Sequence, residues 1–167
     1  TYTANITDVN GCNTTASVTI TEPSAAVSIS VNSTTAISCF GGNDGQAAIT
    51  ANGGTAPYTC LWDTGATTAA VSGLATGTYT VTVTDVNGCI FTINEFVSQP
   101  SAALNASVLV SANVLCYAGS NGSIDLTVNG GTAPYSYNWS NGSTTQNISG
   151  LTAGVYDVTV PDANGCI

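Results

Sequence analysis

The 167-residue sequence contains no lysine, no arginine and no histidine, while nine acidic residues give it a formal net charge of −9. Without histidine or lysine there is no ordinary general base near neutral pH and no imidazole ligand for a metal ion. Without arginine or lysine nothing neutralises phosphate groups, so nucleic-acid binding is excluded. Only 5% of the residues are charged, yet 43% are hydrophobic. This composition predicts a folded protein whose surface consists mainly of Thr, Ser, Asn and Gly.

Threonine alternates with larger residues along several segments of the chain. In residues 78–84 every second residue is Thr, and Tyr79, Val81 and Val83 stand between them. An alternation with a period of two predicts a strand with one buried face. Asn-Gly pairs, which favour tight turns, follow or separate such segments. No stretch has the period of an amphipathic helix, so we predict an all-β protein.

The sequence repeats itself with a period of 77 residues. Cys39 and Cys116 are 77 residues apart, and so are Trp62 and Trp139. About half of the positions in 24–90 are identical to those in 101–167, a level that chance does not supply. We therefore predict three units in what we expect to be an excerpt from a longer array. These are residues 1–23, the C-terminal strands of a truncated repeat; residues 24–100, a complete repeat; and residues 101–167, a repeat that lacks its last strand.

The turn spacing within one unit predicts the type of fold. About seven short strands in each unit, with turns every 8 to 12 residues or so, indicate tandem immunoglobulin-like antiparallel β-sandwich domains. Trp62 and Trp139 fall where such a sandwich places its core aromatic residue, on the third strand. Tyr79 and Tyr156 end a Leu-x-x-Gly-x-Tyr pattern that resembles the corner before the sixth strand. We predict that these four aromatic residues and the thiol of Cys60 lie in the cores.

Five motifs recur in the same order in the two longer units. In the complete unit they are Cys39-Phe-Gly-Gly-Asn-Asp-Gly45, Gly53-Gly-Thr-Ala-Pro-Tyr58, Trp62, Leu74-Ala-Thr-Gly-Thr-Tyr79 and Asp85-Val-Asn-Gly-Cys89. This combination resembles the SprB-type repeat of very large surface adhesins from gliding Bacteroidetes and their relatives, which the type IX secretion system exports. The resemblance implies a stalk of tandem Ig-like repeats outside the cell, at the cell surface.

Five of the six cysteines occupy two positions of the repeat: Cys39 and Cys116 precede the second strand, and Cys12, Cys89 and Cys166 follow an Asn-Gly turn. Small units outside the reducing cytosol commonly gain stability from disulfides. One alternative joins Cys39 to Cys89 within a repeat. The other joins Cys39 to Cys166 between repeats, because the two turns of one sandwich would lie roughly 25 Å apart, beyond the reach of a disulfide. In that case the other three cysteines have partners outside this sequence. Both alternatives stay open here.

An Asp-x-Asn-Gly pattern recurs at three places and carries two oxygen-bearing side chains ahead of each glycine. Extracellular Ca²⁺ sites between sandwich domains use this kind of spacing. The competing interpretation is a β-turn in which Asp and Asn cap their own backbone. Calcium is the only cofactor that the sequence suggests, and its candidate ligands are Asp8, Asn10, Asp85, Asn87, Asp162 and Asn164.

The sequence also offers candidate glycosylation sites and candidate catalytic carboxylates. The eight Asn-x-Ser/Thr sequons are candidate glycosylation sites, although several of them arise from the abundance of Asn, Ser and Thr alone. They are Asn5, Asn13, Asn32, Asn105, Asn121, Asn138, Asn141 and Asn147. Carboxylate pairs such as those of glycosidases would have to come from Asp44, Asp63 and Asp85, and nothing in the sequence places two of them across a cleft. We expect no enzymatic activity.

These observations predict a structural role. The first hypothesis is the shaft of an extracellular filament or giant surface adhesin, built from disulfide-stabilised tandem Ig-like repeats. The alternative is a carbohydrate-binding module in which loops around Trp62 and residues 52–58 attach to a surface polysaccharide. The expected partners are neighbouring repeats of the same chain, identical chains in a fibre, or a surface polysaccharide. We expect neither nucleic acid nor membrane insertion of this segment.

Overall fold

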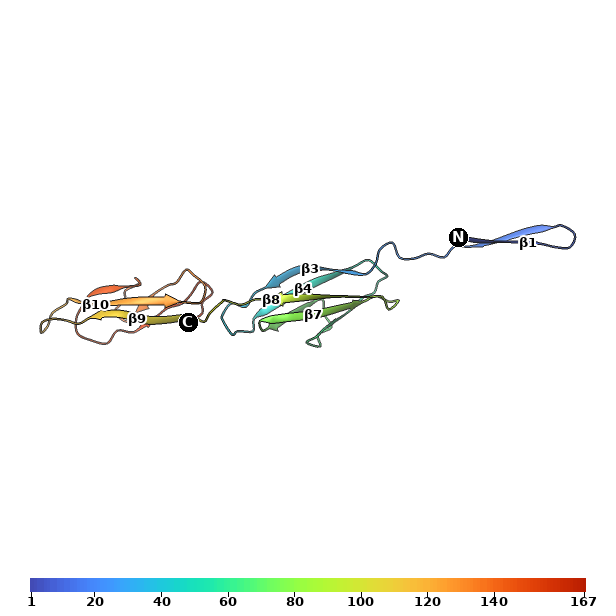
Figure 1. Cartoon of the computed structure of the whole chain (residues 1–167). Coiled ribbons are helices and arrows are strands. Elements are labelled where there is room, and N and C mark those ends of the chain that lie inside the picture. The colour runs from blue at the N-terminus through green and yellow to red at the C-terminus, as the bar shows by residue number, and fades with distance from the viewer.

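The computed structural model describes the backbone of all 167 residues and every side chain except those of Leu109, Val110 and Ser111. The described chain is all-β and contains no helix, so it also contains no helix long and apolar enough to cross a membrane. Three bodies follow one another in an extended row (Figure 1). They are an N-terminal hairpin of β1 and β2, a first sandwich built from β3 to β8 and a second sandwich built from β9 to β13.

The first sandwich consists of two three-stranded antiparallel sheets. One sheet has the order β3-β4-β6, from β3 (Ser28–Thr35), β4 (Gly45–Asn52) and β6 (Ala70–Leu74). The other has the order β5-β7-β8, from β5 (Thr59–Trp62), β7 (Gly77–Thr84) and β8 (Ile90–Val97). These orders resemble the A-B-E and C-F-G sheets of an immunoglobulin-like sandwich. The unit has six strands where the sequence predicts about seven, because residues 63–69 form turns and bends between β5 and β6.

The alternation of Thr with larger residues places the larger side chains in the core between these sheets. Val81, Val83 and Val97 are fully buried, and Trp62 is 1% exposed. The indole N–H of Trp62 donates a hydrogen bond to the carbonyl of Thr68 at 2.9 Å, so the buried ring leaves no polar atom unpaired. The threonines of β7 stand on the opposite face, where Thr82 bonds Thr92 of β8 at 3.0 Å. The prediction of a half-buried strand over 78–84 is confirmed.

The second sandwich has the same plan but less regular structure. One sheet has the order β12-β10-β9, from β9 (Asn105–Ala112), β10 (Gly122–Asn129) and β12 (Ile148–Leu151). The other contains only two short strands, β11 (Asn138–Trp139) and β13 (Val158–Thr159). Its buried core is Leu126, Trp139, Ile148, Leu151 and Val160. In the described chain no strand stands at the position that β8 has in the first sandwich.

The N-terminal hairpin pairs β1 (Tyr2–Thr7) with β2 (Asn13–Val18). At a shift of 77 residues, its two strands correspond to β7 and β8. All twelve residues of the two strands are exposed, because no second sheet within this chain covers them. The large side chains Tyr2, Val18 and Ile20 are accordingly 60% to 72% exposed.

Matching local features recur in the two sandwiches. The peptide bonds Ala56-Pro57 and Ala133-Pro134 are both cis. The hydroxyl of Tyr79 donates to the carbonyl of Ala75 at 3.0 Å, and that of Tyr156 donates to the carbonyl of Thr152 at the same distance. This bond from a tyrosine back to the preceding loop is the corner interaction that the Leu-x-x-Gly-x-Tyr pattern predicts.

Candidate functional site

The junction between the two sandwiches is held by a disulfide. Cys39 and Cys166 are bonded, with an S–S distance of 2.01 Å and Cα atoms 5.7 Å apart, although 127 residues separate them in sequence. Cys39 belongs to the loop between β3 and β4 of the first sandwich, and Cys166 follows β13 of the second. The structure therefore has the pairing between repeats and not the alternative pairing of Cys39 with Cys89, which is a free thiol.

A buried side chain and two hydrogen bonds attach the loop that carries Cys39 to the first sandwich. The side chain of Ile37 is 2% exposed in the core, and its N–H donates to the carbonyl of Ser98 at 2.8 Å. The N–H of Gly41 donates to the side-chain oxygen of Gln99 at 2.9 Å. Both acceptors lie directly after β8, so the end of the last strand positions the cysteine loop.

Asp44 closes the same loop. Its carboxylate accepts hydrogen bonds from the hydroxyl of Ser38 and, at 3.0 Å, from the N–H of Ser38. These bonds lower the pKa of Asp44 below its usual value, since they stabilise the charged form. Ser38 is the residue before the bonded cysteine, so the carboxylate holds the loop at the point where it meets the next repeat.

On the other side of the junction, Asp162 holds the turn that carries Cys166. One oxygen, Oδ1, accepts from the N–H of Asn164 at 2.8 Å and from the N–H of Cys166 at 2.9 Å. The other, Oδ2, accepts from the N–H of Thr132 at 2.8 Å. Burial alone would raise the pKa of Asp162, but the backbone donors outweigh it and the pKa is lowered. The carboxylate is thus charged and ties two loops of the second sandwich together.

A direct hydrogen bond accompanies the disulfide. The side-chain amide of Asn164 donates to the carbonyl of Ser38 at 2.9 Å and to the hydroxyl of Thr132 at 3.2 Å. The first of these bonds crosses from the second sandwich to the first. The residues on either side of the disulfide, Ser38 and Asn164, therefore also hold the two bodies together.

Comparison with known families matches the part of each unit that contains the first cysteine. The model of the SprB repeat matches residues 31–67 and again residues 108–144. Two segments of the chain are thus similar to the SprB repeat, which is consistent with a SprB-type repeat region. The two matches begin 77 positions apart, so they agree with the repeat that the sequence shows. No curated protein matches the chain.

The similarity to this repeat indicates a structural, surface-associated protein. SprB repeats are structural repeats and not an enzyme family, and they are typical of surface-associated proteins. The disulfide is consistent with that location, because disulfides persist outside the reducing cytosol. The matched segments include Cys39 and Cys116 but end before the Asn-Gly-Cys turns.

The predicted calcium ligands form backbone caps in this structure. In the first sandwich the carboxylate of Asp85 accepts from the N–H groups of Asn87, Cys89 and Thr55 at 2.8 to 2.9 Å. Burial by itself would raise the pKa of Asp85, yet these donors lower it. Asp8 in the hairpin likewise accepts from Asn10 and Cys12. Among the described residues no group of three or more acidic, Cys or His side chains could hold a metal. Calcium binding stays a prediction.

The predicted core residues are buried or half-buried, whereas the free cysteines of the repeat and the sequon asparagines are exposed. Trp62 and Trp139 are 1% and 5% exposed, so neither offers a ring face to a sugar. Tyr79, Tyr156 and Cys60 are half-buried and pack against the two cores. Cys12, Cys89 and Cys116 are exposed free thiols. The asparagines of all eight sequons, from Asn5 to Asn147, are exposed.

Two parts of the junction leave no signal in the amino-acid sequence. The pairing of Ser98 and Gln99 with the Cys39 loop joins residues about 60 positions apart, and no local pattern reports such a contact. The bond from Asn164 to Ser38 spans a separation of 126 residues. The Asp-x-Asn-Gly-Cys pattern did contain a signal, because a carboxylate two and four residues before backbone N–H groups is typical of an Asx-type turn.

Proposed function

We propose that this SprB-repeat region is a structural shaft of an extracellular filament or giant surface adhesin, in which disulfides between consecutive repeats keep the sandwiches in line. The observation that carries the proposal is the bond between Cys39 and Cys166, which connects different sandwiches instead of stabilising one. A disulfide within a domain resists unfolding only. A disulfide between domains also restricts how the domains bend relative to each other.

The noncovalent contacts support the same role. The bond from Asn164 to Ser38 lies beside the disulfide, and Asp44 and Asp162 hold the two loops that meet there. A junction with both covalent and polar contacts resists bending in more than one direction. The two sandwiches joined in this way lie end to end along one line (Figure 1).

The surface composition supports a shaft that is exposed along its whole length. The chain has no lysine or arginine, so trypsin-like proteases find no cleavage site in it. Thr, Ser and Asn cover the outer faces of the strands, where cross-strand pairs such as Thr82 with Thr92 form. Such a surface suits a long projecting element, and its net negative charge opposes close approach to an acidic cell envelope.

Small-angle X-ray scattering of the oxidised protein tests this role. We expect a rod whose cross-section is one sandwich wide, and Cys39→Ser should shorten the average end-to-end distance by allowing the junction to bend. Cys12→Ser, which removes an exposed free thiol away from the junction, is the matched control and should leave the rod unchanged. A bent or hinged particle in the oxidised protein, unaffected by Cys39→Ser, would contradict the proposal. Labelling of intact cells with an antibody against the chain tests the location.

A further inference from the structure

The two bonded cysteines of the junction are not neighbours in the order of cysteines along the chain. Cys39 and Cys166 are separated by 127 residues. Three other cysteines lie between them: Cys60, Cys89 and Cys116. In an unfolded chain the chance that two residues meet falls with about the 3/2 power of their separation. Cys60 and Cys89 are 21 and 50 residues from Cys39, so they would meet it roughly fifteenfold and fourfold more often than Cys166 does.

Folding of the first sandwich takes Cys60 and Cys89 out of the reach of Cys39. The Cys39 loop is attached to residues 98–99, directly after β8, whereas Cys89 stands directly before β8. The eight residues of β8 hold these two thiols roughly 25 Å apart, and a disulfide needs Cα atoms within about 7 Å. Cys60 lies opposite Val83, near the end of β7 that leads to Cys89, and is half-buried against the core. Neither thiol can therefore bond Cys39 in the folded sandwich.

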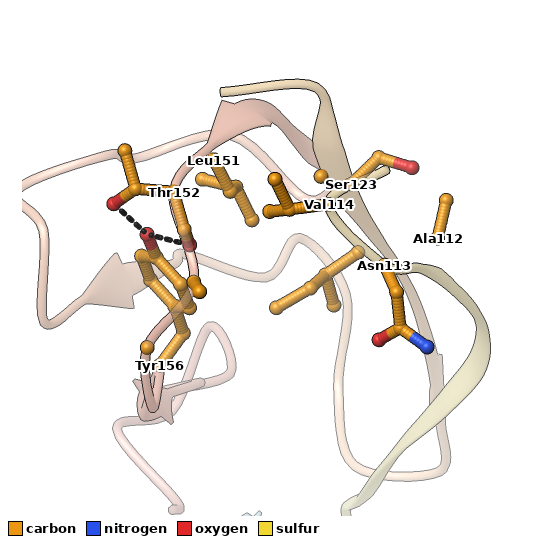
Figure 2. Close-up of a pocket in the computed structure, with 11 residues that line it drawn as sticks. Ala112, Asn113, Val114, Ser123, Leu151, Thr152 and Tyr156 are labelled. Carbon is orange, nitrogen blue, oxygen red and sulfur yellow. Dashed lines mark hydrogen bonds between the residues drawn. The ribbon is translucent and has the colours of Figure 1, made fainter. Parts of the chain in front are cut away.

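Folding of the second sandwich takes Cys116 out of reach in the same way. Its loop precedes β10, and Figure 2 shows Val114 of this loop beside Leu151 at that end of the sandwich. The turn of Cys166 lies at the other end of β10, where Asp162 bonds to the loop that follows the strand. Of the four cysteines from Cys60 onward, only Cys166 lies within reach of Cys39 once both sandwiches are folded.

The cores of the two sandwiches do not include the disulfide. The buried cluster of the first sandwich contains residues between 27 and 97 other than Cys39, and that of the second contains residues between 126 and 160. The hydrogen bond from Asn164 to the carbonyl of Ser38, at 2.9 Å, lies beside the disulfide. Two folded sandwiches thus have a polar contact of their own that can hold Cys39 near Cys166.

We propose that the junction disulfide forms last, by thiol–disulfide exchange on sandwiches that are already folded. The thiolate of one junction cysteine attacks a small disulfide such as oxidised glutathione, and one thiolate leaves. The other cysteine thiolate then displaces the second from the mixed disulfide, so that the two protons of Cys39 and Cys166 end on the two released thiols. An oxidant that acts before folding would instead bond Cys39 to Cys60 or Cys89. The class of reaction that supplies the junction is therefore oxidation of a folded substrate.

This inference goes beyond the proposed shaft, because it concerns the order of the steps that make the junction. Scattering of the finished, oxidised protein does not depend on that order. Failure of the inference therefore leaves the shaft intact. A bent particle in the oxidised protein would contradict the shaft and leave the order of folding and oxidation as proposed.

Oxidation before and after folding tests the order, in a protein with Cys12→Ser to remove the thiol of the hairpin. The reduced protein is either folded in buffer, with circular dichroism as the check, or kept unfolded in urea, and is then treated with oxidised glutathione. After folding, peptide mapping should find Cys39 bonded almost entirely to Cys166. In urea, its bonds to Cys60 and Cys89 together should exceed the bond to Cys166 at least about tenfold.

Two variants separate the effect of loop length from that of the folded junction. Cys60→Ala should remove the most frequent product of Cys39 in urea and leave the yield of its bond to Cys166 in the folded protein unchanged. Asn164→Ala removes the hydrogen bond across the junction and should slow disulfide closure in the folded protein by about two- to tenfold. Asn141→Ala, in an exposed turn of the same sandwich, is its matched control and should close at the rate of the parent.

Three results would overturn the inference. The first is the same predominance of the bond between Cys39 and Cys166 in urea as in buffer, because folding would then not select the pair. The second is a mixture of partners for Cys39 in the folded protein. The third is a reduced protein that has no folded structure in buffer and folds only as this bond forms, because the bond would then precede folding.

Discussion

The two sandwiches have similar sequences but differ in how much regular structure they contain. In the first, β5 has four residues and β7 has eight, whereas the corresponding β11 and β13 have two each. Val81 in the first is fully buried, while Val158 at the same repeat position is only half-buried. The difference follows β8, which pairs with β7, whereas residues 101–167 stop short of the positions that correspond to β8. The long-range neighbour, more than the Thr and Val alternation, decides how far the strand extends.

The cysteine loops differ for the same reason. The loop of Cys39 is held by Ile37 in the core and by the residues after β8. In the loop of Cys116, Leu115 is 83% exposed and Tyr117 is fully exposed. Ala118 has a φ of 57°, a left-handed conformation that costs a residue with a Cβ more than the glycine found at the same place in the first loop. The residues that follow β8 thus position Cys39 for its bond to the next sandwich.

The largest effect should come from the core tryptophans, which test whether the two sandwiches unfold separately. Trp62→Ala should destabilise the first sandwich by about 3 to 5 kcal/mol, because it leaves a large cavity between the sheets. Trp139→Ala should cost less, since its surroundings are less completely packed. Denaturant unfolding followed by far-UV circular dichroism detects the transition of the altered sandwich, while the fluorescence of the remaining tryptophan reports on the other sandwich alone. Loss of both transitions in either variant would show that the sandwiches are one cooperative unit.

Removal of the junction disulfide should have the next largest effect and should fall mainly on the second sandwich. Cys39→Ser should lower the free energy of unfolding by about 2 to 4 kcal/mol, because the crosslink restricts the unfolded chain. The first sandwich is held by its complete β8, whereas the second depends more on the tie at Cys166. Cys12→Ser serves as the control and should change neither transition. A loss confined to the first sandwich would contradict this comparison.

A smaller side chain at Val97 should loosen the end of the first sandwich that supports the Cys39 loop. Val97→Ala removes two buried methyl groups from the core of this sandwich, and should cost about 2 kcal/mol. The adjacent Cys39 loop, which the residues after Val97 support, should exchange its amide hydrogens faster. Val86→Ala, at a position 58% exposed, is the control and should have little effect. If the amide hydrogens of the loop exchanged at the same rate as in the parent protein, the order of the loop would not depend on β8.

Much of the fold could be predicted from the sequence because its signals are local or periodic. The alternation of Thr with Tyr and Val predicts the strand over 78–84. The 77-residue repeat predicts that Trp62 and Trp139 are equivalent core residues. The candidate site was predicted only as two alternatives for Cys39. Choosing between them requires the relative placement of two sandwiches, which depends on contacts between residues more than 100 positions apart, such as Ser38 and Asn164.

The capping carboxylate of the junction predicts acid sensitivity. The pKa of Asp162 is lowered in the folded state, below the ordinary value of 3.8, because backbone N–H groups stabilise its charge. The unfolded state therefore binds a proton at higher pH than the folded state. The resulting stability is complete well above about pH 4 and is lost as the pH falls through the folded pKa. Asp162→Asn should lower the free energy of unfolding at pH 7 and should make it fall less steeply as the pH decreases.

Thermal unfolding of the second sandwich between pH 7 and pH 2 measures this effect. Asp125→Asn removes an exposed carboxylate from the same sandwich and is the matched control. It should leave both the stability at pH 7 and the shape of the acid decline close to the parent. An Asp162→Asn variant that declined in acid as steeply as the parent would show that other carboxylates cause the transition.

The smallest effect should come from calcium, and it separates the two interpretations of the Asp-x-Asn-Gly turns. In both sandwiches the carboxylate oxygens of this turn already accept three backbone N–H bonds, at Asp85 and at Asp162. A calcium ion would need these oxygens and several more, since it takes six to eight ligands. We therefore expect millimolar calcium to leave both melting transitions where they are, as magnesium does. A rise in melting temperature with calcium but not with magnesium, if Asp162→Asn abolished it, would mean that the turn opens to bind the ion.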